Sequence, residues 1–283
     1  RCVRYHVETT GNDRVGITGI DTLPIYQVDA FTTELFSGNP AAVCVLTDPA
    51  SDEVMQAIAS ENNLSETAFI NISVQPFFIR WFTPLMEVNL CGHATLAAAR
   101  ILFDDYLPPQ VREISFGSRS GILSAIKRDD LILLNFPVDI PTKIKSISTI
   151  QNGLGVNPVS ILRGKEDLLA VFETESTIAS IVPDYSILSR LDSRGLIITA
   201  PGATSDFVSR FFAPQSGINE DPVTGSAHTV LTPYWANILD KQTLTSRQLS
   251  DRGGTLYCEL LGERVLIGGA TRRYMKGSIT IPN

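Results

Sequence analysis

Residues 80–103 read RWFTPLMEVNLCGHATLAAARILF, and much of the same pattern returns at residues 210–227, RFFAPQSGINEDPVTGSA. In each copy an aromatic, strand-like run ends at a proline, and a glycine later opens a helix-like stretch. The copies begin 130 residues apart, at Arg80 and Arg210. A repeat of about half the chain predicts two similar domains, with any site that uses both copies in the cleft between them.

The composition is that of an ordinary globular protein rich in strands. A chain of 283 residues corresponds to about two domains. Its hydrophobic content is 43%, with 20 glycines and 16 prolines, as in strand-rich proteins with many turns. Short runs rich in β-branched and aromatic residues alternate with turn formers, and few stretches have a helical period. The predicted fold class is therefore α+β.

The domain boundaries follow from breaks in this pattern. Residues 1–22 are polar and show little periodicity, so we expect an N-terminal extension without a function of its own. We expect a first domain at residues 23–140 and a second at 141–283. Packing of the last strand on the first domain instead is an alternative that stays open. Pro137 ends the last strand-like run of the first half.

Charge and cysteine usage exclude several classes of protein. The net charge is −7 and no run of lysine or arginine offers a stripe for phosphates, which excludes nucleic acid as a partner. No apolar run is long enough to span a bilayer, and no signal core is present, so we expect a cytoplasmic protein without a membrane partner. Cys2, Cys44, Cys91 and Cys258 are widely scattered, which favours reduced thiols over disulfides or a metal site.

Two buried helices are expected to follow the repeated glycines. Residues 94–103 are apolar on nearly every side, which predicts a helix inside its domain. The second helix starts near Ala227, and Pro233 is expected to kink or end it after about two turns. A helix N-terminus presents unpaired N–H groups and a positive dipole end, so two such starts facing one cleft would bind a small anion.

Four motifs resemble the PhzF-like isomerases of the phenazine-biosynthesis type. They are residues 36–42, FSGNPAA; residues 63–69, NLSETAF; the first glycine–histidine helix start; and residues 220–227, EDPVTGSA. The resemblance covers residues 23–283 and implies the diaminopimelate-epimerase fold. In that fold, two similar domains each wrap a β-barrel-like sheet around a central helix. It also implies a site without metal or organic cofactor and commonly a homodimer. Glu66 and the paired helix starts favour a small, carboxylate-bearing substrate.

Glu66 is the expected catalytic base. A glutamate between a helix end and a strand is ordinarily a solvated turn residue. Its neighbours Leu64, Ala68 and Phe69 are apolar, however, which favours a partly dry site for proton transfer. By resemblance to the family, Glu66 takes a proton from one substrate carbon and returns it to another.

His93 and Asp221 are expected to support Glu66. Each would ordinarily be a hydrogen-bonding residue at a helix start or turn. The resemblance implies instead that they bind and orient the substrate beside Glu66. The remaining substrate contacts are expected from Asn39, Gly92, Gly225 and Ser226.

Cys91 carries the main alternative. In related epimerases and racemases two thiols act as acid and base, and Cys91 falls where the first would lie. The second copy has Thr224 there, and a hydroxyl is a far weaker acid than a thiol of pKa ~8.5. The sequence thus favours an isomerase that uses Glu66. An amino-acid epimerase or racemase that uses Cys91, and a non-catalytic ligand-binding protein of the same fold, stay open.

Overall fold

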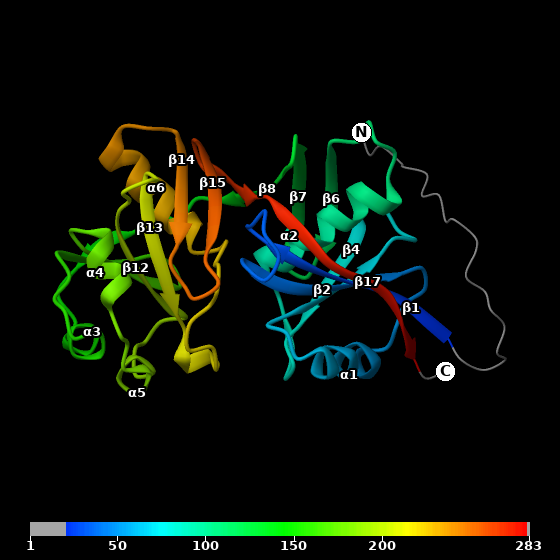
Figure 1. Cartoon of the computed structure of the whole chain (residues 1–283), viewed down its shortest axis with the longest axis horizontal. Helices are drawn as coiled ribbons and strands as arrows, with labels where there is room; N and C mark the ends of the chain where they lie inside the picture. The colour runs from blue at the N-terminus through cyan, green and yellow to red at the C-terminus, as the bar shows by residue number, and fades with distance from the viewer. Residues whose placement is uncertain (1–20, 282–283) are drawn as a thin grey trace. The chain divides into compact units, whose positions relative to one another are not determined.

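A computed structural model of the chain describes residues 21–281 (Figure 1). It divides into two compact units. Unit 1 contains residues 21–35, 40–134 and 270–281, and unit 2 contains residues 36–39 and 135–269. Residues 1–20 of the predicted extension lie outside the described residues, whereas Asp21 and Thr22 already belong to the first strand. Within the described part of the chain, no helix is long and apolar enough to cross a membrane.

Unit 1 is a sheet of mixed direction with two helices, and β2 and β8 continue at one end into residues of unit 2. Its elements are β1 (Asp21–Ala30), β2 (Asn39–Leu46), α1 (Asp52–Asn62), β3 (Thr67–Asn71), β4 (Phe77–Phe82), β5 (Glu87–Val88), α2 (Gly92–Ile101), a π-helical turn (Leu102–Tyr106), β6 (Glu113–Ser118), β7 (Gly121–Arg128), β8 (Leu131–Pro137) and β17 (Thr271–Ile281).

The strands of unit 1 pair in the order β17–β1–β2–β3–β4–β6–β7–β8. The pairings β2–β3 and β4–β6 are parallel, and β3–β4, β6–β7 and β7–β8 are antiparallel. The parallel connection from β4 to β6 passes through α2, which packs against β1, β3 and β17 (Figure 1). All residues of α2 except Gly92 and Arg100 are buried, as the sequence predicts for an apolar helix inside its domain.

Unit 2 repeats this arrangement with different connections. Its elements are β9 (Thr142–Ile144), α3 (Ser148–Leu154), β10 (Ser160–Arg163), β11 (Asp167–Val171), α4 (Glu175–Ser180), α5 (Tyr185–Leu188), β12 (Gly195–Pro201), β13 (Phe207–Phe212), a 3₁₀ turn (Pro214–Ser216), α6 (His228–Leu239), β14 (Thr243–Gln248), β15 (Gly254–Leu261) and β16 (Arg264–Gly269).

The pairings of unit 2 follow the same alternation as those of unit 1. β11–β12 and β13–β14 are parallel, and β12–β13, β14–β15 and β15–β16 are antiparallel. The parallel connection from β13 to β14 passes through α6, the counterpart of α2. α6 packs against β14, β15 and β16 (Figure 1). Each unit therefore has a sheet folded around one helix that follows a glycine.

α6 does not end at Pro233, which was one of the two outcomes expected there. The helix neither ends nor breaks after two turns but continues from His228 to Leu239 with Pro233 inside it. Proline has no N–H to give to the carbonyl four residues earlier, which belongs to Thr229. The backbone N–H of Asp139 donates to that carbonyl instead, at 3.1 Å. The orphaned acceptor thus has a partner, which removes one of the two costs that proline imposes on a helix.

The two copies of the repeated sequence carry the same side-chain arrangement in their units. Arg80 donates from Nε and Nη2 to Glu87, and its guanidinium lies 5.0 Å from the centre of the Phe82 ring. Arg210 donates in the same way to Glu220, and its guanidinium lies 5.0 Å from the Phe212 ring. In both units an arginine thus binds a glutamate carboxylate, and its guanidinium lies over the ring of the aromatic residue that ends the strand.

Candidate functional site

Glu66 lies in unit 1, in the short connection between α1 and β3. Asn63 ends α1 in the left-handed conformation, with φ of 49°, and turns the chain toward the sheet. The Glu66 carbonyl then accepts the backbone N–H of Ala42 at 3.3 Å, which ties this connection to β2. With its backbone held there, the Glu66 side chain is largely buried, at 14% exposure.

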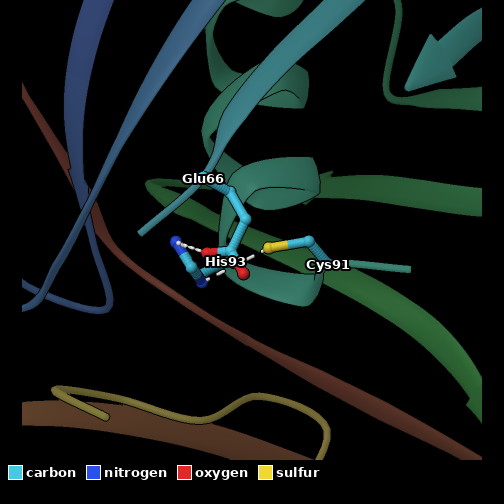
Figure 2. A group of neighbouring side chains, drawn as sticks. All are labelled: Glu66, Cys91 and His93. Atoms are coloured by element: carbon cyan, nitrogen blue, oxygen red, sulfur yellow. Dashed lines mark hydrogen bonds and ion pairs between the residues drawn. The ribbon is translucent and has the colours of Figure 1, made fainter. Parts of the chain in front are cut away.

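The Glu66 side chain faces the first turn of α2 (Figure 2). His93 Nε2 lies 3.4 Å from Glu66 Oε2, and the His93 side chain is only 8% exposed. The other ring nitrogen of His93, Nδ1, lies 3.5 Å from Cys91 Sγ. The structure therefore brings two of the three predicted catalytic residues together and adds Cys91 to them.

Burial sets the charge of His93. Loss of solvent around the ring lowers the pKa of His93 to about 4, because the charged form is poorly solvated there. At neutral pH the imidazole is therefore uncharged and carries one N–H and one acceptor nitrogen. It can offer Glu66 a hydrogen bond, although Nε2 and Oε2, 3.4 Å apart, do not have the geometry of one in this structure.

The same three side chains are also a possible metal-binding set. One donor atom each from Glu66, Cys91 and His93 lies within 4.8 Å of the others. His93 contacts Cys91 through Nδ1 and Glu66 through Nε2, so its two contacts use different ring nitrogens. A histidine binds a metal through one nitrogen, so an ion held by all three donors would replace at least one of these contacts.

Asp221 lies in unit 2, directly before the repeated glycine segment. Its Oδ1 accepts from Asn39 Nδ2 at 2.9 Å, and its Oδ2 accepts from the Thr224 hydroxyl at 2.5 Å. Gln248 binds both the Asp221 carbonyl and the Thr224 backbone, which fixes the loop. Burial raises the pKa of Asp221 to about 6, although the hydrogen bonds from Thr224 and Asn39 act in the opposite direction. Asp221 can therefore change its protonation near neutral pH.

Ser226 is held by a cation that the sequence analysis missed. Arg194 Nη1 donates to Ser226 Oγ at 2.9 Å. Asp167, which is buried, accepts from Nε and Nη2 of the same guanidinium. Arg194 also lies 5.4 Å from the centre of the Phe211 ring, and a side chain at Gly195 would overlap that ring. Because Arg194 occupies an acceptor position of Ser226, the serine hydroxyl is free to donate its own proton to a ligand.

Gly92 and Gly225 open the helical segments in the two units. Gly92 is the first residue of α2, and the preceding Cys91 makes no side-chain cap to the helix. Gly225 begins a turn that leads into α6, where the N–H of His228 binds the Gly225 carbonyl at 3.0 Å. The first backbone N–H groups of a helix have no partner within the helix, so both segments offer donors suited to a carboxylate or an oxyanion.

The predicted site residues thus form two groups, each described within its own unit. Glu66, Gly92 and His93 lie in unit 1, where Glu66 and His93 are in contact. Asn39, Asp221, Gly225 and Ser226 lie in unit 2, where Asn39 binds Asp221 directly. The residues that sequence reasoning missed are Asp167, Arg194 and Gln248. Local sequence does not reveal the contact between Asp167 and Arg194. It arises because the pairing of β11 with β12 places Asp167 beside Gly195, the neighbour of Arg194.

Comparison with known proteins places the chain in a family. The model of the family described as phenazine biosynthesis-like protein (PhzC-PhzF) matches residues 28–277. A protein of Pseudomonas aeruginosa named as an uncharacterized isomerase is 49% identical over 259 residues, which cover 92% of this chain and 99% of that protein. These matches confirm the resemblance predicted from the four motifs.

Solved structures agree with this placement. The crystal structure of a PhzF-family protein from Enterococcus faecalis has a TM-score of 0.89 and 46% identity, and covers 92% of this chain and 99% of its own. A hydroxyproline epimerase from Agrobacterium vitis, at 9% identity and a TM-score of 0.59, covers 93% of each chain and shares the fold alone. The predicted epimerase-like α+β fold is thereby confirmed, and the chain belongs to the phenazine biosynthesis-like family of isomerases.

Proposed function

We propose that this isomerase moves a proton between two carbons of a small, carboxylate-bearing metabolite without a metal or organic cofactor, with Glu66 as both acid and base. The observation that carries the proposal is the largely buried Glu66 carboxylate in contact with the His93 imidazole at the start of α2. A carboxylate removed from most water is suited to exchange protons with carbon, because fewer water molecules compete for its charge.

The proposed reaction has two proton transfers. Glu66 takes a proton from a carbon next to an electron-withdrawing group, and the electron pair of that C–H bond moves into the substrate. The N–H groups at the start of α2 stabilise the negative charge that develops. The protonated Glu66 then gives the proton to a second carbon and regains its charge. The substrate gains and loses no atoms overall, as an isomerisation requires.

His93 and Asp221 bind and orient the substrate in this proposal. For His93, the support is its contact with Glu66. For Asp221, the support is a pKa of about 6, because its carboxyl group can then accept or donate a hydrogen bond near neutral pH. Ser226, with its hydroxyl proton left free by Arg194, and the backbone N–H groups of Gly92 and Gly225 supply donors for the substrate carboxylate. Asn39 acts by holding Asp221.

Replacement of Glu66 by glutamine tests the proposal. Glu66→Gln keeps the shape of the side chain but cannot take a proton from carbon. We expect it to lower solvent-deuterium uptake into substrate by at least ~10²-fold, the scale of a positioned acid–base group, with binding largely kept. Deuterium uptake is measured by mass spectrometry over a panel of small unsaturated and amino carboxylic acids.

Glu61→Gln is the matched control, since Glu61 is an exposed glutamate of α1 only five residues away in sequence. It should leave deuterium uptake at the wild-type level. Uptake that persists in Glu66→Gln would show that another residue is the base. A chain that binds a carboxylic acid but exchanges hydrogen in none of the panel would instead be a non-catalytic ligand-binding protein of this fold.

A second candidate is an amino-acid epimerase or racemase that uses Cys91. The contact of 3.5 Å between Cys91 Sγ and His93 Nδ1 favours it, because it places the thiol next to a proton acceptor. In such an enzyme Cys91→Ser should be as damaging as Glu66→Gln, since a hydroxyl cannot replace a thiol as acid. The unit 2 counterpart, Thr224, binds Asp221 and supplies no second thiol.

Homodimeric assembly and a cytoplasmic location stay predictions from the sequence and the family resemblance. Size-exclusion chromatography with light scattering tests the first of them on the purified chain.

A further inference from the structure

We propose that Cys91 is a positioning residue whose thiol fixes the tautomer of His93, so that the imidazole presents an N–H to the Glu66 carboxylate. This inference rests on the proposed function, because it gives Cys91 a role through the residue proposed as acid and base. It concerns the contacts of His93 with Cys91 and with Glu66, which Figure 2 marks with dashed lines.

Each ring nitrogen of His93 has a neighbour. Cys91 Sγ lies 3.5 Å from Nδ1, within the range of a hydrogen bond to sulfur, and Glu66 Oε2 lies 3.4 Å from Nε2. The Nε2···Oε2 pair is close but does not have the geometry of a hydrogen bond in this structure, and catalytic contacts often tighten only when substrate binds. Both Cys91 and His93 are buried, so water competes little with these contacts.

The chemistry of the three groups permits one arrangement when Glu66 is ionised. A carboxylate only accepts, so the ring nitrogen that faces it, Nε2, must carry the hydrogen. A neutral imidazole has one N–H, so Nδ1 is then an acceptor and needs a donor. The Cys91 S–H is that donor. Without it, the ring loses the contact that favours the Nε2–H form over the Nδ1–H form.

The backbone around Cys91 keeps the thiol available for this contact. Cys91 precedes α2 at the position where a side chain normally caps the helix, and Ser51 does so for α1 by accepting the N–H of Val54. Cys91 makes no such cap at α2. Its carbonyl is instead held by the N–H and the hydroxyl of Thr95, at 3.1 and 2.6 Å. The thiol is therefore not used to cap α2 and contacts His93 instead.

Unit 2 offers an independent parallel. Thr224 precedes Gly225 as Cys91 precedes Gly92, and its hydroxyl donates to Asp221 Oδ2. In each unit, then, the side chain before the helix-opening glycine contacts the group proposed to act on the substrate. The partner is a ring nitrogen of His93 in unit 1 and the carboxylate of Asp221 in unit 2.

The tautomer can be measured directly on the full chain without any substrate. Long-range ¹H–¹⁵N correlation spectra of ¹⁵N-histidine-labelled protein at pH 7 distinguish the protonated from the unprotonated ring nitrogen. The chain has three histidines, and His93→Asn identifies the signals of His93. We expect the Nε2–H form in the wild type, a shift toward the Nδ1–H form in Cys91→Ala, and the wild-type form in Cys91→Ser, whose hydroxyl also donates.

His228 provides an internal reference of the opposite tautomer. Its Nδ1 faces the Thr224 carbonyl at 2.9 Å, which only accepts, so Nδ1 must carry the hydrogen there. The Ser246 hydroxyl lies 2.6 Å from its Nε2 and serves as donor. His228 signals that stay unchanged in Cys91→Ala and Cys91→Ser show that both variants are folded, so that a change at His93 is local.

Activity separates this inference from the proposed function. We expect Cys91→Ala to lower kcat by roughly ten- to a hundred-fold, less than the full effect of a positioned acid–base group, with little change in KM. Cys91→Ser should keep most of the activity. An Nδ1–H form in the wild type, or a tautomer unchanged in Cys91→Ala, overturns the inference even if Glu66→Gln abolishes exchange. Exchange that persists in Glu66→Gln overturns the proposed function whatever the tautomer of His93.

Discussion

Asp221 is a single residue whose surroundings change its acidity in a measurable way. Burial raises the pKa of Asp221 to about 6, above the ordinary value of about 3.9. Between these two pH values the folded chain holds a proton on Asp221 that the unfolded chain has lost. The contribution of this residue to the free energy of unfolding therefore decreases as the pH rises from about 4 to about 6.

Asp221→Asn should remove this dependence. Relative to the variant, the wild type should lose on the order of 1–2 kcal/mol of unfolding free energy between pH 4 and pH 7. Urea unfolding at several pH values measures it, and the exposed Asp240→Asn in the same unit is the control. Parallel curves for wild type and Asp221→Asn would contradict the expectation.

The unfolding free energies of wild type and Asp221→Asn must be compared at each pH. Two buried imidazoles also make stability depend on pH, and their effect has the opposite sign. Burial lowers the pKa of His93 and of His228 to about 4, below the ordinary value of about 6.5. Their stabilising contribution is present above about pH 6.5 and is lost as the pH falls toward 4. The difference between wild type and Asp221→Asn cancels this background.

At this scale the sequence identified the acidic and imidazole groups but not the cation near them. The motifs that name Glu66, His93 and Asp221 are local, so they can be read along the chain. The pair Asp167–Arg194 depends on parallel pairing of β11 with β12, which sets Asp167 opposite Gly195. The register of two strands separated by two helices leaves no periodic mark in the sequence.

Among the elements, α6 shows how a helix tolerates proline. Pro233 would ordinarily cost ~3 kcal/mol in a helix interior, partly through the unpaired carbonyl four residues earlier. Here Asp139 donates to that carbonyl. We expect Pro233→Ala to change the free energy of unfolding by less than about 1 kcal/mol, because the N–H that the alanine introduces would compete for an acceptor that is already bound.

Urea unfolding of the single variant Pro233→Ala and of the wild type measures this change in unfolding free energy. A gain close to ~3 kcal/mol would mean that the Asp139 contact contributes little. The sequence predicted where α6 begins and could not predict its length, since the compensating donor lies 90 residues earlier in the chain, at Asp139 against Thr229. By contrast α2 needs no distant partner, and its composition alone predicted a buried helix.

At the scale of the whole molecule, the last strand belongs to the first unit. β17 pairs antiparallel with β1 along the full length of β1, and Met275, Ile279 and Ile281 pack against the core of unit 1. The family and fold were predictable because their motifs lie in order along the chain. The partner of β17 was left open, because a pairing between strands more than two hundred residues apart has no local sequence signal.

A chain ending at Ala270 tests the dependence of unit 1 on β17. We expect amide hydrogen exchange to accelerate throughout β1 and its neighbours in unit 1, because the apolar side chains that β17 covers become exposed. Unit 2 keeps all its strands, so its protection should stay near that of the full chain. A chain ending at Ile281 is the control, and full protection of unit 1 in the shorter chain would contradict the expectation.

The pairing of β1 with β17 also determines how long β1 lacks its partner strand while the chain is being synthesised. A ribosome makes β1 before β17, with more than two hundred residues between Ala30 and Thr271. At ~5–20 residues per second, the nascent chain waits roughly 10–50 s before the last strand leaves the exit tunnel. During that interval one edge of β1 has no strand beside it, and such an edge can recruit strands from other nascent chains. Before β17 pairs with β1, the chain is therefore more exposed to such association than after it has folded.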